Sequence, residues 1–114
     1  MDPRPIGVFD SGLGGLTAVR QLTAGMPNET IVYFGDTGRV PYGSRSRDTI
    51  RRYARQDAAF LLSQNVKMVI AACGTVSSVA ADLGETHPVP FLGVLDPTAR
   101  AAAAATRSGK IGVI

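Results

Sequence analysis

The sequence predicts an α/β protein with a doubly wound parallel sheet of alternating βα units, and it predicts that this sheet is incomplete. Short apolar runs typical of buried strands alternate with segments of helical periodicity along the 114 residues. Turn-forming residues separate the two kinds of segment, and no internal repeat or low-complexity linker interrupts them. Strands that alternate with helices in this way form parallel βαβ units, so helices are expected on both faces of an open sheet.

Five short segments are expected to form the strands. Each is apolar and is bounded by turn-forming residues. The five segments are Pro5–Asp10, Thr30–Gly35, Val66–Ala72, Val89–Leu95 and Lys110–Ile114. A complete domain rarely ends on an unpaired strand such as the last one, so we expect the chain to be part of a longer protein.

Four segments with helical periodicity follow the first four strands. Gly25 and Pro27 end the first helix, Ser46 can cap the second, and Gly84 ends the third. The loop before the second helix, residues 36–46, contains two glycines and a proline. The expected helices are Leu16–Gly25, Ser46–Ser63, Thr75–Leu83 and Pro97–Arg107.

Composition indicates a globular protein, because 45% of the residues are hydrophobic and 18% are charged. No apolar run is long enough to span a bilayer, and the N-terminus lacks the apolar stretch of a signal peptide. The single cysteine excludes an intrachain disulfide. We therefore expect a cytoplasmic protein with no membrane partner.

The chain has a net charge of +3, and five of its arginines lie between residues 45 and 55. Such a cluster would suit a nucleic acid, but three of these arginines share one side of the expected second helix. Charge runs of this kind usually form solvated helix surfaces, and no nucleic-acid-binding motif accompanies them. We therefore expect no nucleic-acid partner. No histidine, cysteine or acidic cluster has the spacing of metal ligands, so no metal site is expected either.

Three successive strands end in polar, turn-forming triplets. These triplets are Asp10–Gly12, Asp36–Gly38 and Cys73–Thr75. Turn residues are common at strand ends, and one such triplet would need no functional explanation. Ligands of open α/β sheets bind beyond the carboxyl ends of the strands, however, so three triplets at one edge predict a polar pocket there.

Cys73 and the glycine-rich loop at residues 10–15 each allow a structural and a functional interpretation. A lone cysteine is most often a small buried hydrophobe, but Cys73 also precedes a helix, whose dipole favours a thiolate. The glycine-rich loop opens a helix and either binds an anion or forms only a tight turn. It is not a dinucleotide fingerprint, because Thr17 stands where a glycine is needed, and it lacks the lysine of a P-loop.

Taken together, these motifs resemble the opening half of glutamate racemases, in the aspartate/glutamate racemase family. The resemblance covers nearly the whole chain in order, and three motifs at family spacing make it specific. The matching segments are Ile6–Thr17, Phe34–Gly43, Ala71–Thr75, Gly93–Ala101 and Gly109–Ile114.

The resemblance implies an enzyme that interconverts L- and D-glutamate without a cofactor. Two cysteines on opposite faces of the substrate Cα would act as base and acid, and Cys73 would be one of them. The second cysteine of the family lies beyond the residues present here, so the chain alone is expected to be inactive. The substrate-binding residues implied by the match are Asp10, Ser11, Pro41, Tyr42, Gly43, Gly74 and Thr75.

The resemblance also bears on domain organisation and biological role. Residues 1–95 would form the first racemase α/β domain, incomplete without its C-terminal return, and residues 96–114 would begin a truncated second α/β domain. The full-length enzyme would be a homo-oligomer, most simply a dimer. Its product would be D-glutamate for peptidoglycan, and hence for cell wall biogenesis and cell shape.

One residue departs from the family pattern, and two other functions stay open. Gly74 stands where the family usually has asparagine, which removes an amide that could contact the substrate. A racemase of a related acidic amino acid is one alternative, although residues 40–43 favour the glutamate enzymes. The other is a non-catalytic anion-binding α/β module, in which Cys73 would have no chemical role.

Overall fold

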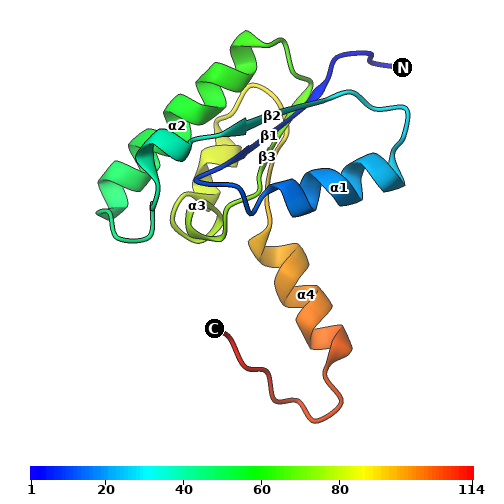
Figure 1. Ribbon diagram of the computed structural model, residues 1–114, viewed down its shortest axis with the longest axis vertical. Coiled ribbons are helices and arrows are strands. Elements are labelled where there is room, and N and C mark those ends of the chain that lie inside the picture. The colour runs from blue at the N-terminus through cyan, green and yellow to red at the C-terminus, as the bar shows by residue number, and fades with distance from the viewer.

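The computed structural model describes residues 1–114 and contains a four-stranded, all-parallel sheet with the strand order β2-β1-β3-β4 (Figure 1). The strands are β1 (Ile6–Asp10), β2 (Ile31–Gly35), β3 (Met68–Ala71) and β4 (Phe91–Gly93). The α-helices are α1 (Leu16–Gly25), α2 (Arg47–Ser63), α3 (Gly74–Val79) and α4 (Leu95–Ala105). Two short 3₁₀ helices are η1 (Thr37–Arg39) and η2 (Ala81–Glu85). The expected α/β class is therefore confirmed.

Helices cover the sheet from two sides. A Cβ at Gly7 of β1 would lie 3.2 Å from the Leu61 side chain of α2, so this side of β1 faces α2. The α2 helix also packs against α3. The other side of the sheet faces α1, whose Leu22 lines a cavity together with Ile70 of β3 and Leu92 of β4. This arrangement is that of a doubly wound sheet.

The hydrophobic core lies between the sheet and the layer formed by α2 and α3. Phe9 of β1 is fully buried, and its ring centroid lies 6.2 Å from that of Phe91 in β4. The buried face of α2 consists of Ile50, Ala54, Asp57, Ala58 and Leu61. Four of these residues have the apolar character and the spacing that an amphipathic helix needs, and Asp57 is the polar exception.

The side of the sheet that faces α1 is covered less completely. A cavity of about 1050 Å³ lies between α1, β4 and the start of α4. Leu92 and Leu95 beside it remain about half exposed. The α4 helix and the following residues extend away from the sheet (Figure 1). No residue of α4 is buried.

Two expected elements differ from those observed. The segment expected as a helix to Leu83 is helical only to Val79, because Ala80 has φ −129° and the backbone tightens into η2. The strand expected at Lys110–Ile114 does not form. Ile111, Val113 and Ile114 are exposed there and no strand lies beside them, so their backbone groups have no ladder to join.

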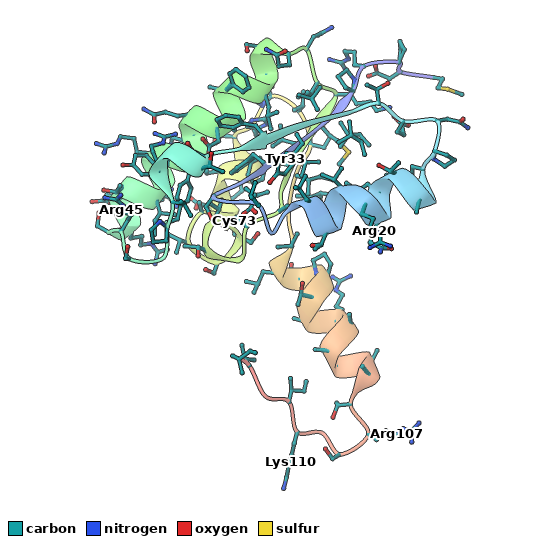
Figure 2. All side chains as sticks on the ribbon, in the orientation of Figure 1. Arg20, Tyr33, Arg45, Cys73, Arg107 and Lys110 are labelled. Carbon is teal, nitrogen blue, oxygen red and sulfur yellow. The ribbon has the colours of Figure 1, made fainter.

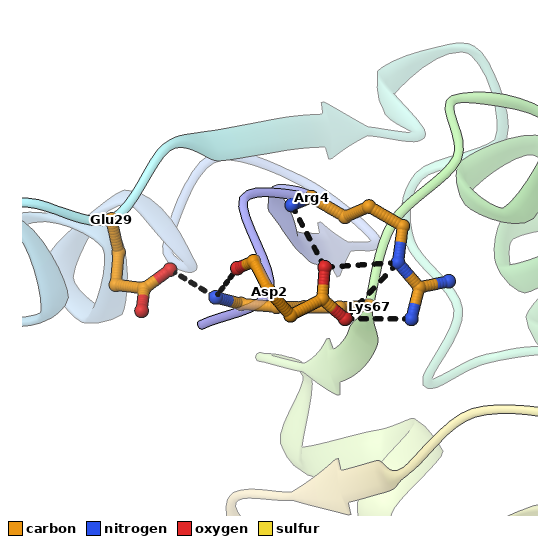
Figure 3. Close-up of polar contacts among 4 residues, drawn as sticks. All are labelled: Asp2, Arg4, Glu29 and Lys67. Carbon is orange, nitrogen blue, oxygen red and sulfur yellow. Dashed lines mark hydrogen bonds and ion pairs between the residues drawn. The ribbon is translucent and has the colours of Figure 1, made fainter.

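The amino ends of the strands are joined by ionic contacts (Figure 3). The Lys67 ammonium, just before β3, donates to Glu29, which precedes β2, and to the main-chain oxygen of Asp2. The Asp2 carboxylate in turn accepts from the Arg4 guanidinium. Three segments far apart in sequence are thus connected at this edge. The longest helix has 17 residues, and no helix combines the length and the apolar character needed to cross a bilayer.

Candidate active site

The carboxyl ends of β1 and β3 bring two of the expected site residues into contact. Cys73 directly follows β3 and precedes the first residue of α3 (Figure 2). Its thiol lies 3.5 Å from the hydroxyl oxygen of Ser11, which follows β1, and can donate to it. Cys73 is only 4% exposed. The thiol is therefore held at the meeting point of two strand ends, largely shielded from water.

Asp10 occupies the end of β1 and is tied to the loop that follows it. One carboxylate oxygen accepts from the backbone N–H of Ser11 at 2.7 Å, and the other accepts from that of Gly15 at 2.6 Å. A Cβ at Gly15 would lie 2.8 Å from the Cβ of Asp10, so only glycine allows this close approach. The N–H groups of Ser11 and Gly15 already donate to Asp10, so this loop has fewer free N–H groups with which to bind an anion.

The loop at residues 41–43 exposes main-chain atoms at the surface, whereas the side chain of its middle residue, Tyr42, is buried. Pro41 and Gly43 are exposed, whereas Tyr42 is only 1% exposed and its ring points into the core. A Cβ at Gly43 would lie 3.9 Å from the Thr75 hydroxyl oxygen. The loop therefore adjoins the start of α3 and exposes main-chain atoms beside Thr75.

The start of α3 leaves open space beside the thiol. Gly74 is exposed, and a Cβ added to it would meet no atom within 4 Å. Thr75 is partly exposed and lies next to the 41–43 loop. The structure therefore has room for a larger side chain at position 74, where glycine leaves it unfilled.

A buried polar cluster anchors the 41–43 loop from beneath. The Tyr42 hydroxyl lies 2.5 Å from a carboxylate oxygen of Asp57 in α2 and also meets the carboxylate of Asp36. The Arg39 guanidinium bonds to Asp36 at 2.7 Å and to Asp57 at 3.1 Å. We refer to Asp36, Arg39, Tyr42 and Asp57 as the tyrosine cluster. It connects the end of β2, η1, the loop and α2.

Burial dominates the electrostatics of the tyrosine cluster. It raises the pKa of Asp57 to about 7, and the negative charge of Asp36 adds to this rise, whereas the hydrogen bond from Tyr42 opposes it. Burial also raises the pKa of the Tyr42 hydroxyl, as do its bonds to Asp36 and Asp57. Near neutral pH the cluster can therefore retain a carboxyl proton, which allows the two acids to share one phenol.

Asp57 and Tyr33 were not among the residues expected at the site. Tyr33 donates to the main-chain oxygen of Gly12 at 2.9 Å and so steadies the glycine-rich loop. Nothing in the sequence around Tyr33 indicates this contact. Asp57 does leave a signal, because it stands on the apolar stripe of α2, three residues after Ala54 and four before Leu61. A charged residue on such a stripe indicates a buried partner.

The cavity of about 1050 Å³ between α1, β4 and α4 is lined by none of the expected site residues. No group of three or more histidine, cysteine or acidic side chains lies close enough together to hold a metal ion. The arrangement at Cys73 can support acid/base or nucleophilic chemistry by a thiol flanked by hydroxyl and main-chain groups.

Comparisons with known proteins identify the relatives of this chain. No family model matches it. A glutamate racemase of Chlorobaculum tepidum is 53% identical over 112 residues, which cover 96% of this chain and 41% of that protein. A glutamate racemase of Syntrophus aciditrophicus is 57% identical over 111 residues, which cover 96% of this chain and 41% of that protein. The chain thus spans about 41% of the length of these relatives.

A solved structure agrees with the sequence comparison. The glutamate racemase of Francisella tularensis, in complex with D-glutamate, superposes with a TM-score of 0.83 at 47% identity. The match covers 91% of this chain and 40% of that one. Likeness in both sequence and fold extends along nearly all of the residues described above. The chain is therefore a homologue of the N-terminal part of glutamate racemases.

Proposed function

We propose that this chain supplies one acid/base thiol, Cys73, and part of the substrate site of a cofactor-independent glutamate racemase. The observation that carries the proposal is the position of the Cys73 thiol, buried at a strand end and 3.5 Å from the Ser11 hydroxyl. A structural cysteine would need only apolar neighbours. Homology to glutamate racemases, one of them solved with D-glutamate, supports glutamate as the substrate.

The proposed reaction transfers a proton at the substrate Cα. Cys73 as a thiolate would take the Cα proton from one face, or as a thiol would return one to that face. A second thiol must serve the opposite face, and Cys73 is the only cysteine in these residues. We therefore propose that the racemase polypeptide is longer, with residues 1–95 in its first domain and 96–114 opening its second, and that this chain alone does not racemise glutamate.

The substrate would be held by the residues around the thiol. The Asp10 carboxylate would attract the substrate ammonium, and the Ser11 hydroxyl would bind beside it. Main-chain groups of Tyr42, Gly43 and Gly74, with the Thr75 hydroxyl, would bind the carboxylates, while Pro41 shapes the loop. Hydrogen bonds from backbone N–H groups would also stabilise the negative charge that develops when the Cα proton leaves.

The cellular role is part of the same proposal. A racemase of this kind supplies D-glutamate for peptidoglycan, and reactive thiols persist in the reducing cytoplasm, where we place the enzyme. We expect the full-length protein to be a homodimer.

The test follows hydrogen exchange at the glutamate Cα in deuterated water, by proton NMR. In the full-length racemase polypeptide, Cys73→Ala should lower exchange from both enantiomers on the order of 10³-fold, because one face loses its base and the other its acid partner. Thr23→Ala, at an exposed position of α1, is the matched control and should leave exchange unchanged. Normal turnover by Cys73→Ala would refute the assignment.

Substrate choice and the isolated chain are tested in the same way. Aspartate in place of glutamate should exchange far more slowly, and the opposite order would favour a racemase of a related acidic amino acid. The 114-residue chain should leave the optical activity of glutamate unchanged in circular dichroism. Sustained loss of optical activity with this chain would show that a single thiol suffices.

A further inference from the structure

Asp57 is a buried acid for which the proposed reaction has no direct use. It lies within α2, is fully buried, and is surrounded on its helix face by Ala54, Ala58 and Leu61. Burying a carboxyl group among apolar residues is unfavourable unless specific partners compensate. A small apolar residue would fill the same position on the helix without this cost, so the contacts of Asp57 indicate what the acid contributes.

Those contacts lead directly to the 41–43 loop. One oxygen of Asp57 accepts from the Tyr42 hydroxyl at 2.5 Å, and the other accepts from Arg39 at 3.1 Å. Tyr42 is the only buried residue between Val40 and Thr49, so its side chain is the anchor of an otherwise exposed segment. Its ring also packs against Tyr53 of α2, with centroids 5.4 Å apart.

The anchor fixes main-chain groups that face the thiol turn. Gly43 directly follows Tyr42, and a Cβ on it would lie 3.9 Å from the Thr75 hydroxyl oxygen. The Arg45 N–H donates to the Tyr42 main-chain oxygen at 2.9 Å, so the turn closes over the same residue. Any shift of the Tyr42 ring would therefore move Gly43 relative to Thr75.

We propose that Asp57 is a positioning residue: through Tyr42 it holds the main chain of the 41–43 loop against the Cys73–Thr75 turn, where the substrate binds. This proposal rests on the glutamate site proposed above. The charged and titratable groups that face Asp57 are Asp36 from the end of β2, Arg39 from η1 and Tyr42 from the loop. From its own helix, Gln56 and Tyr53 contact Arg39.

The number of hydrogens available to Tyr42 and its two acidic partners explains why position 57 holds an acid, which can also donate, and not a group that only accepts. The Tyr42 hydroxyl carries one hydrogen but meets two carboxyl groups. Tyr42 can donate to one of them and accept from the other only when one carboxyl group is protonated. A proton lost from the cluster leaves two carboxylates competing for one donor, which weakens the hold on Tyr42. Loop position and glutamate affinity should therefore depend on pH near neutrality.

The experiment uses four variants of the full-length racemase polypeptide. Asp57→Ala removes both contacts, and Tyr42→Phe removes only the hydroxyl. Asp57→Asn retains an acceptor and a donor and imitates the protonated acid. Asp48→Asn, at an exposed position of the same helix, is the matched control. Amide hydrogen exchange at Arg45 and amide shifts of Gly43 and Thr75 report loop position, exchange at Phe9 and Val69 reports the fold, and titration with L- and D-glutamate reports binding.

We expect Asp57→Ala and Tyr42→Phe to speed exchange at Arg45 and raise the glutamate dissociation constant roughly tenfold, with Phe9 and Val69 still far more protected than Arg45. Asp57→Asn should bind glutamate as tightly as the parent does at pH 6, and should lose the weakening that the parent shows between pH 6 and pH 8. A purely structural role would change thermal stability in all three variants but leave both the pH profile and the Gly43 and Thr75 shifts unchanged, and that result would overturn the proposal.

The loop readout separates this proposal from the proposed function. If the full-length parent polypeptide binds neither enantiomer of glutamate, the site assignment fails. Exchange at Arg45 and the shifts of Gly43 and Thr75 still decide whether Asp57 positions the loop. Unaltered loop signals in Asp57→Ala, with an intact fold, would refute the positioning role whether or not glutamate binds.

Discussion

The two edges of the sheet place charged side chains in opposite environments. At the amino edge, the Lys67–Glu29 and Arg4–Asp2 pairs are partly open to water. At the carboxyl edge, Asp10, Asp36 and Asp57 are buried, and their partners are backbone N–H groups or members of the tyrosine cluster. Acidic side chains thus form partly solvated ion pairs at one edge and buried hydrogen bonds at the other.

Buried contacts, and not partly solvated ion pairs, determine the positions of the loops. Exposed ion pairs gain little, because water competes with each partner and both side chains lose freedom when they pair. Buried acids cannot turn to water, so losing one partner costs the desolvation of the group left behind. We therefore expect changes at the carboxyl edge to be large and sensitive to pH, and changes at the amino edge to be small and sensitive to salt.

The largest loss of stability from a mutation should follow the removal of the Tyr42 hydroxyl at the carboxyl edge. Tyr42→Phe keeps the buried ring but leaves Asp36 and Asp57 without their shared donor, which should lower the free energy of unfolding by about 2–3 kcal/mol. Tyr53→Phe, in the neighbouring ring, should cost less than about 0.5 kcal/mol. Urea unfolding at pH 7, followed by circular dichroism, measures both. Equal losses in the two variants would show that the buried partners of the Tyr42 hydroxyl add no stability.

The free energy of unfolding should depend on pH through the protonation of Asp57. Its pKa is about 7 in the folded chain, raised by burial from the ordinary value of 3.8, so between these values the folded chain holds a proton that the unfolded chain releases. The free energy of unfolding should therefore fall as the pH rises from about 4 to about 7, on the order of 4 kcal/mol, and level off above that range. Asp57→Asn should flatten the curve in this interval. A parent curve that rises steadily to pH 7 would contradict the expected sign.

A smaller effect is expected at the open position beside the thiol. Gly74→Asn places an amide in space that a Cβ can enter freely, and one added hydrogen bond to glutamate should raise affinity by about 1 kcal/mol. Gly74→Ala fills the space without an amide and should leave affinity unchanged. NMR titration with D-glutamate compares the two variants. Equal gains in both would assign the effect to backbone stiffening at the start of α3 rather than to the amide.

The smallest effect should come from the amino edge. Glu29→Gln removes the charge that pairs with Lys67 and should lower the free energy of unfolding by less than about 1 kcal/mol. The loss should shrink further in about 0.5 M salt, because added ions screen partly solvated charges more than buried ones. Glu85→Gln, at an exposed acid that forms no ion pair, is the control for charge alone. A loss larger than that of Tyr42→Phe would reverse the order of the two edges.

The order of the elements could be predicted from the sequence, whereas their ends and the final strand could not. Hydrophobic periodicity and turn residues identified the four strands and four helices, because these signals are local. The early end of α3 at Val79 depends on how η2 meets the sheet. The apolar run at Lys110–Ile114 has strand character, but a strand forms only where a neighbouring strand supplies hydrogen bonds.

For the site, the sequence could predict which strand ends matter but not how the side chains there are connected. The resemblance pointed to Asp10, Ser11 and Cys73, and the structure places the Ser11 hydroxyl beside the Cys73 thiol. That the Tyr42 side chain is buried in the core, with its hydroxyl on Asp57 fifteen residues later, is a tertiary contact. Local patterns carry no information about such a pairing, although the acid on the apolar face of α2 was a visible sign of it.

The double tie of Asp10 has a consequence for ligand selectivity. Because its two oxygens already accept the N–H groups of Ser11 and Gly15, the loop offers an incoming anion fewer donors and more negative charge. A dicarboxylate without an amino group, such as glutarate, would approach this carboxylate with nothing to offset the repulsion. The two hydrogen bonds that hold Asp10 in the turn would thus make the proposed site prefer amino acids over the same acids without an amino group.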